Sequence, residues 1–219
     1  MTLATFHTDV ANALGRGTSL SSQIPTWTKR AVSWLERNYS FQYMKRYLTL
    51  TIDLDADYPN YVAIGDYSFK KFRSLSYLAP GASRRRPIPR VEPEDRETTP
   101  AGNPGGYWLD GLSNLVLDTI PEEAITLHLH ANLFTIWPTD TTFNHFLLRE
   151  GYDILFPRTM MNAARELRNP TMFDTWKTDL LDNITTFNVS EEDLQEGGKL
   201  ERLEWSPTYD EFDEDMESD

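Results

Sequence analysis

The sequence predicts an α+β fold, a helical bundle from N- and C-terminal helices with an inserted antiparallel β subdomain and an extended C-terminal tail. Apolar residues recur at helical spacing in the first 38 residues, and this spacing returns from Thr141. Between them, from Lys45 to about Ala131, short runs with a period of two are separated by Pro, Gly and Asp. We therefore expect the following parts: N-terminal helices at 1–44, the β subdomain at 45–140, C-terminal helices at 141–197 and a tail at 198–219.

Two helices are expected before the β subdomain. The first covers residues 3–14, where Leu3, Phe6 and Val10 share one face and Gly15 ends the run. The second has Ser22 as its N-cap and Pro25 in the first turn, where amide groups have no acceptor within the helix. Its apolar face consists of Ile24, Trp27, Ala31, Trp34 and Leu35. It ends at the break Tyr39-Ser40.

A strand is expected directly after this helix, at residues 45–54, because Leu48, Leu50, Ile52 and Leu54 alternate with polar residues. The other expected strands are 61–64, 72–79, 106–109, 112–117 and 124–131. The pair Asp110-Gly111 predicts a hairpin whose two turn residues both have positive φ. Residues 81–90 and 92–105 are expected to be flexible surface loops.

From Thr141 the helical period predicts one long helix or two coaxial helices, with a kink or break at Pro157. Asn169-Pro170 predicts the N-cap and first residue of a further helix. The stripe of that helix consists of Phe173, Trp176, Leu180, Ile184 and Phe187. Residues 190–195 are expected to add one turn, and Gly197-Gly198 to end the ordered structure.

Charge is distributed unevenly along the chain. The net charge is −13, from 21 basic and 34 acidic residues. Residues 208–219 contain seven of the acids and no base, which leaves −6 for the other 207 residues. A protein that grips duplex DNA needs a basic surface, so the body is not expected to bind DNA in this way, although an acidic channel that DNA slides past is compatible with it.

Other features of the composition limit the class of protein. The chain has no Cys, which excludes disulfides and thiolate metal sites and fits assembly in a reducing cytoplasm. The first residues have no basic segment typical of a signal peptide, and no apolar run is long enough to span a bilayer. We expect no membrane partner.

The tail is expected to be disordered until it binds a partner. It carries more large apolar side chains than a solubilising terminus needs, and this favours docking. These side chains are Leu200, Leu203, Trp205, Tyr209 and Phe212.

Few residues point to chemistry. His128 and His130 lie two apart in a strand and share a face, so they could bind one metal, but the favoured interpretation is a polar outer face opposite Ile125, Leu127 and Leu129. Paired acids for glycoside hydrolysis would have to come from loops, which favours solvated side chains. These acids are Glu92, Glu94, Asp95, Glu122 and Glu123. We therefore expect no enzyme activity, no cofactor and no metal.

The basic cluster Arg84, Arg85 and Arg86 has two interpretations. It contacts DNA phosphates or an acidic neighbouring subunit, or it is a solvated loop.

The order of elements resembles that of bacteriophage head-to-tail adaptor proteins. The matching features are a helix that begins Ile24-Pro25 and contains Glu36-Arg37, the alternating strand after it, and the segment YVAIG at 61–65. The helix pair in residues 146–184 completes the pattern, so that the resemblance covers about Pro25 to Ile184.

The resemblance implies a virion protein of the neck, which forms a ring, usually of twelve copies, between the portal and the tail of a podovirus-like particle and lets DNA pass. The implied partners are the portal protein, a tail nozzle or stopper protein and other copies of the chain. Portal-binding residues would be Trp176, Leu200, Leu203, Trp205, Tyr209 and Phe212. A stopper role stays open beside the adaptor role. The alternatives are a phage-tail peptidoglycan hydrolase and an acidic module that binds a host factor.

Overall fold

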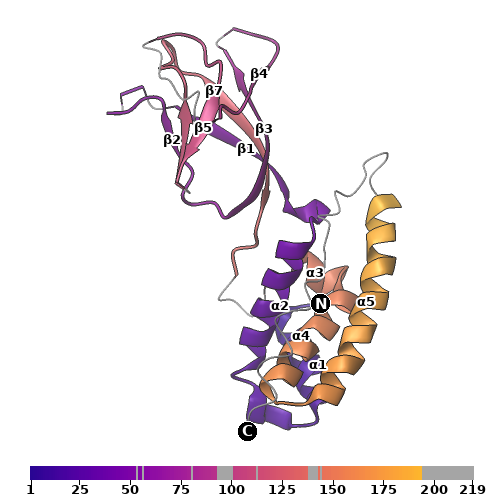
Figure 1. Cartoon of the computed structure of the whole chain (residues 1–219). Coiled ribbons are helices and arrows are strands. Elements are labelled where there is room, and N and C mark those ends of the chain that lie inside the picture. Colours follow the sequence, from indigo (N-terminus) through magenta and orange to yellow (C-terminus); the bar gives the residue numbers. More distant parts are fainter. Residues whose placement is uncertain are drawn as a thin grey trace. The chain divides into compact units, whose positions relative to one another are not determined.

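The fold is described from a computed structural model of the chain. The described residues are 1–193 without 53, 56, 80, 93–100, 112, 138–142 and 144, and without the side chains of 17, 18 and 188–193. This part of the chain contains five α-helices and two antiparallel sheets (Figure 1), which confirms the α+β class. The chain divides into two compact units, Met1–Ser40 with Asp140–Asp219, here named the helical unit, and Phe41–Thr139, the β unit.

The helical unit begins with α1, Leu3–Leu14, as the apolar spacing predicts. Thr2 caps it, and Gly15 ends it in the left-handed conformation with φ of 62°. A 3₁₀ turn, η1 at Gly17–Leu20, leads to α2 at Ile24–Asn38. The predicted N-cap of α2 is wrong, because Gln23 occupies that position and makes no side-chain hydrogen bond there. Ser22 instead lies in the turn that joins η1 to α2.

Three helices follow the β unit, namely α3 (Phe146–Arg149), α4 (Tyr152–Glu166) and α5 (Pro170–Asp193). The interruption lies at Gly151, not at Pro157, which is inside α4. Pro157 has no N–H for the carbonyl of Asp153, four residues earlier. The side-chain amide of Asn183 in α5 donates to that carbonyl at 2.9 Å instead. A neighbouring helix therefore satisfies the group that the proline leaves free.

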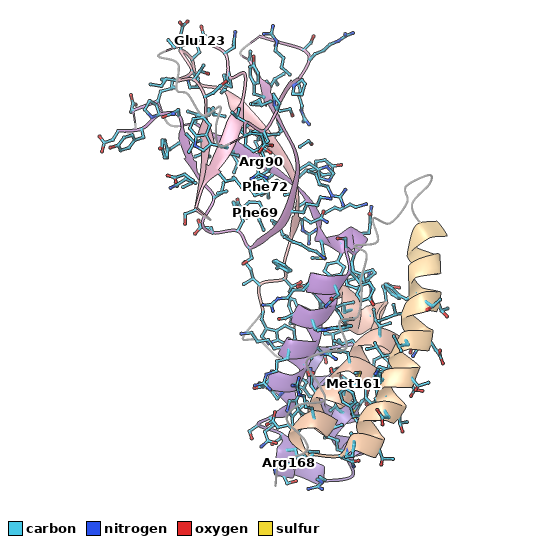
Figure 2. The ribbon with its side chains drawn as sticks, viewed as in Figure 1. Phe69, Phe72, Arg90, Glu123, Met161 and Arg168 are labelled. Atoms are coloured by element: carbon cyan, nitrogen blue, oxygen red, sulfur yellow. The ribbon has the colours of Figure 1, made fainter. Side chains whose placement is uncertain are left out.

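The start of α5 follows the sequence prediction. Asn169 Oδ1 accepts from the backbone N–H of Met172 at 3.0 Å, which confirms the N-cap. Arg168, labelled in Figure 2, turns the chain from α4 into α5 with φ of 52°. The helix continues to Asp193 without the separate turn expected from residue 190. Of its predicted stripe, Leu180 and Ile184 are buried and the aromatic members are half-buried.

Aromatic rings join α1, α4 and α5. Phe6 of α1 contacts Tyr152 and Phe156 of α4 edge to face, with ring centroids 5.8 and 6.1 Å apart. Phe156 contacts Trp176 of α5 in the same way, at 5.4 Å. The first and last helices of the described chain thus share one core.

The β unit contains two sheets. The first has the strand order β1-β7-β3-β4 and the second β2-β6-β5. The bounds are β1 Lys45–Thr51, β2 Tyr61–Ala63, β3 Phe69–Leu78, β4 Arg86–Ile88, β5 Tyr107–Asp110, β6 Asn114–Leu117 and β7 Thr126–Leu133. A short 3₁₀ turn, η2 at Gln42–Met44, precedes β1. All predicted strands are present, with ends shifted by up to three residues.

Side chains from both sheets form one buried core. Leu50, Leu75 and Leu129 come from the first sheet, and Leu115 and Leu117 from the second. At its border, Phe69 and Phe72 of β3 (Figure 2) have ring centroids 4.4 Å apart. The first and last strands of the unit are neighbours, and their antiparallel register runs from Lys45↔Asn132 to Thr51↔Thr126.

Two local predictions in the β unit need correction. The hairpin between β5 and β6 is confirmed, but Asp110 pairs with Asn114, so three residues connect the strands. Of the predicted turn pair, only Gly111 has positive φ, at 65°. The predicted loop 81–90 contains β4, which pairs with β3 at the edge of the sheet, where Pro87 is tolerated.

Candidate interaction surfaces

A groove rich in cations lies between α2 and α4. It is open to solvent and has a volume of about 520 Å³. Five of its lining residues are basic and none is acidic. The lining consists of Thr26, Lys29, Arg30, Ser33, Trp34, Arg37, Arg158, Asn162 and Arg165. We name it the basic groove. In a chain of net charge −13 this is a local excess of positive charge, which favours the approach of anions.

Arg158 is the least exposed cation of the basic groove. Its guanidinium lies over the ring of Trp34, 4.2 Å from the centroid. Its Nη1 is 4.0 Å from Sδ of Met161, the residue that Figure 2 labels on α4. Its buried Nε has no hydrogen-bond partner among the described residues. Burial, and then the charge of Arg165, lower the pKa of Arg158 to about 10, so the side chain remains a cation at neutral pH.

The two helices that form the basic groove are held together by polar contacts. The indole N–H of the fully buried Trp27 donates to Oε2 of Glu166 at 2.7 Å. Nδ2 of Asn162 donates to the backbone carbonyl of Trp27 at 2.9 Å. Nη1 of Arg30 lies 3.4 Å from the same Glu166 oxygen. These contacts position Arg158 and Arg165 of α4 opposite the basic residues of α2.

A buried acid–histidine pair lies elsewhere in the helical unit, and the sequence analysis missed it. Glu36 of α2 and His145 before α3 are 2% and 8% exposed, with Oε1 and Nε2 4.0 Å apart. Nδ1 of His145 accepts from the backbone N–H of Leu147 at 3.2 Å, which leaves Nε2 to carry a proton toward Glu36. The pair fixes the returning chain on α2. A lone His outside any helix gives no sequence signal for such a contact.

The outer face of the β1-β7-β3 sheet carries His128 and His130. Ile125, Leu127 and Leu129 are buried, which confirms the predicted alternation along this strand. Nε2 of each histidine is buried without a hydrogen-bond partner in the described part of the chain. No group of three or more possible metal ligands occurs there among His, Asp and Glu.

The electrostatic setting of these two histidines favours their neutral forms. Burial lowers the pKa of both, and positive charges add to this effect. The charges are Arg85 near His128, and Arg73 and Lys45 near His130. The ring of His130 also stacks on Tyr47 at 4.3 Å.

The described loop acids considered for hydrolysis have no apolar setting. Glu92, Glu122 and Glu123 are exposed. Glu94 and Asp95 lie outside the described residues. The arginines Arg84, Arg85 and Arg86 are exposed too, and the last of them is the first residue of β4.

The predicted portal-binding residues fall into two groups. Trp176 is half-buried and contacts Phe156 within the helical unit. The other five, Leu200, Leu203, Trp205, Tyr209 and Phe212, lie outside the described residues. Among the α5 residues whose side chains are described, Leu181 is a large apolar residue that is exposed, at 46%.

The β unit also exposes aromatic rings. Tyr58 and Tyr61 are 68% and 38% exposed, and their ring centroids lie 5.5 Å apart. Tyr47 is 78% exposed. Aromatic side chains are enriched at protein–protein interfaces, so these rings are candidate contact residues.

No protein-family model matches the sequence, and no curated protein matches it. Among the described helices, none has the length and apolar character required to cross a membrane.

Proposed function

We propose that this chain is a structural subunit of a bacteriophage neck, an adaptor that forms a ring of about twelve copies between portal and tail. In this proposal the helices form the bundle that builds the ring, and the strands and loops of the β unit contact the next subunit or the tail. A subunit of a closed ring needs two different surfaces that fit each other. The exposed aromatic pair Tyr58 and Tyr61 is the observation that carries the proposal, because it is an uncovered surface of the kind that interfaces use.

The role proposed is binding and not catalysis. The buried pair Glu36 and His145 is closed off by its own unit, and the acids Glu122 and Glu123 are solvated. Neither arrangement supplies an acid in an accessible apolar setting next to a second reactive group, which hydrolysis requires. In contrast, a ring subunit needs only surfaces, and the neck of the virion is its proposed location.

Native mass spectrometry of the purified chain, alone and with portal protein, tests the ring. We expect a closed oligomer, and the double variant Tyr58→Ser with Tyr61→Ser should reduce its amount at least about tenfold, as expected for loss of central aromatic contacts. A monomer under all conditions, with and without portal protein, contradicts the proposal.

A second experiment tests the portal-facing segment. Full-length chain and a truncation that ends at Gly198 are each mixed with purified portal protein and separated by size. We expect co-migration of the full-length chain alone, because the truncation lacks Leu203, Trp205 and Tyr209. Equal binding by both proteins would exclude the segment as the portal contact.

A further inference from the structure

We propose that the basic groove between α2 and α4 binds the acidic C-terminal segment of the same chain, residues 208–219. The inference does not depend on the connector role, since it concerns the isolated chain. It starts from Arg158, a cation withdrawn from water that makes no ion pair with any described residue. A charge in such a place costs free energy unless an opposite charge approaches it. The unpaired Nε of Arg158 is a donor that an incoming carboxylate satisfies.

The charges of groove and segment are complementary. Five cations line the groove without an acid among them. Residues 208–219 contain seven acids and no base. The segment also contains Tyr209 and Phe212, whose rings can pack on Trp34 and on the guanidinium of Arg158.

A segment of the same chain is favoured over nucleic acid for two reasons. Without residues 208–219 the chain still has a net charge of −6. A long nucleic acid that extended beyond the groove would therefore be repelled by the other acidic residues. A tethered segment is also present at an effective concentration of the order of millimolar, whereas a separate ligand must be captured from solution.

The chain between α5 and the segment is long enough. Asn183 of α5 contacts Asp153 of α4, and the two helices are antiparallel. From this contact, Asp193 lies about 15 Å further along α5, at 1.5 Å per residue. Arg158 and Arg165 lie about 8 and 18 Å from the contact in the opposite direction. The span is therefore about 25 to 35 Å, and the linking residues 194–207 reach up to about 46 Å when extended.

Disulfide trapping tests the proposal directly, because the chain has no cysteine of its own. Full-length chain with Ser33→Cys in the groove and Ser218→Cys in the segment is oxidised at low salt. The control pair is Thr175→Cys with Ser218→Cys, since Thr175 is exposed on α5 and lies about 27 Å from Asp193 at 1.5 Å per residue, within the span worked out for the groove arginines. We expect the groove pair to form the intramolecular disulfide at least about tenfold faster, as contact raises the effective concentration.

Charge reversal separates attraction from mere proximity. The double variant Lys29→Glu with Arg37→Glu reverses two exposed charges in the groove and should slow disulfide formation by the groove pair about tenfold. The control variant Arg16→Glu with Arg84→Glu reverses two exposed charges outside the groove and should leave this rate unchanged. Salt of about 1 M should have the same effect as the groove variant, because it shortens the Debye length to about 3 Å.

Three results would overturn the proposal. Equal rates for the groove pair and the control pair show that the segment does not visit the groove. Disulfide-linked dimers in place of the intramolecular bond show that the segment binds another copy. The third result combines equal trapping rates with binding of labelled duplex DNA. If the double variant Lys29→Glu with Arg37→Glu abolishes that binding, the groove is assigned to nucleic acid.

Discussion

The contact between Trp27 and Glu166 makes a quantitative prediction about the helical unit. Trp27 is fully buried, and its N–H donates to a carboxylate that is 44% exposed. Trp27→Phe leaves a void of roughly 40 Å³, which costs about 1 kcal/mol at about 24 cal/mol per Å³. The lost hydrogen bond to a charged but solvated acceptor adds about 1 to 2 kcal/mol. We expect a total loss of about 2 to 3 kcal/mol in the free energy of unfolding.

Urea denaturation followed by far-ultraviolet circular dichroism measures this loss. A double-mutant cycle with Glu166→Ala, which removes the acceptor, isolates the hydrogen bond and should give a coupling energy of about 1 kcal/mol. Arg30→Ala is the control, since its ion pair with Glu166 is exposed and should contribute less than about 0.5 kcal/mol. A loss below about 0.5 kcal/mol for Trp27→Phe, or a cycle without coupling, would refute the reasoning.

Three further predictions follow from single contacts. Gly151→Ala should destabilise the helical unit by about 1 to 3 kcal/mol in the same assay, because its new methyl lies 2.8 Å from a buried side chain of α3. Asn183→Ala should lower the free energy of unfolding by about 1 kcal/mol, because the Asp153 carbonyl loses its donor. The loss should be smaller in a Pro157→Ala background, where the backbone N–H of residue 157 can donate to that carbonyl. His128 and His130 have a pKa below the unfolded value of 6.5, so below that pH the unfolded chain binds more protons at these residues than the folded chain does. The free energy of unfolding should therefore decrease as the pH falls. The decrease should be smaller in the double variant His128→Gln with His130→Gln.

Each of these predictions has a control and a contradicting result. Gly65→Ala places its methyl 3.6 Å from Ser113, an ordinary contact, and should change stability by less than about 0.5 kcal/mol; equal effects at the two glycines would contradict the steric argument. An unchanged cost of Asn183→Ala in the Pro157→Ala background would mean that the amide acts elsewhere. A pH profile identical in wild type and the double histidine variant would exclude these groups as its source.

Patterns within one element were predictable from the sequence. The helix at Leu3–Leu14 has strict apolar spacing and a glycine stop, and the Asn169-Pro170 start has a cap whose chemistry is local. The strand β4 was missed because Arg86 and Pro87 show no apolar alternation, and only its pairing with β3 orders it. The break at Gly151 was misplaced because Pro157 is the stronger breaker within an isolated helix.

The basic groove could not be predicted in the same way. Lys29, Arg30 and Arg37 fit the solvated face of one helix, and Arg158 and Arg165 fit that of another. Their convergence depends on the pairing of α2 with α4, which are separated by more than one hundred residues. The periodicity of apolar residues describes the faces of one helix and does not show which other helix packs against it.

The register between β1 and β7 affects the order in which the molecule can form. Lys45 and Asn132 are partners in that pairing, so a β unit that has already folded brings its own entry and exit within a few ångströms. Joining α2 to α4 then closes a loop of only about two dozen residues in place of about one hundred, which saves about 1 kcal/mol of chain entropy. During synthesis the β unit leaves the ribosome before α4, because it comes first in the chain. Once the pairing of β1 with β7 has formed, the chain that continues to α4 starts near the residue at which the chain from α2 enters the unit.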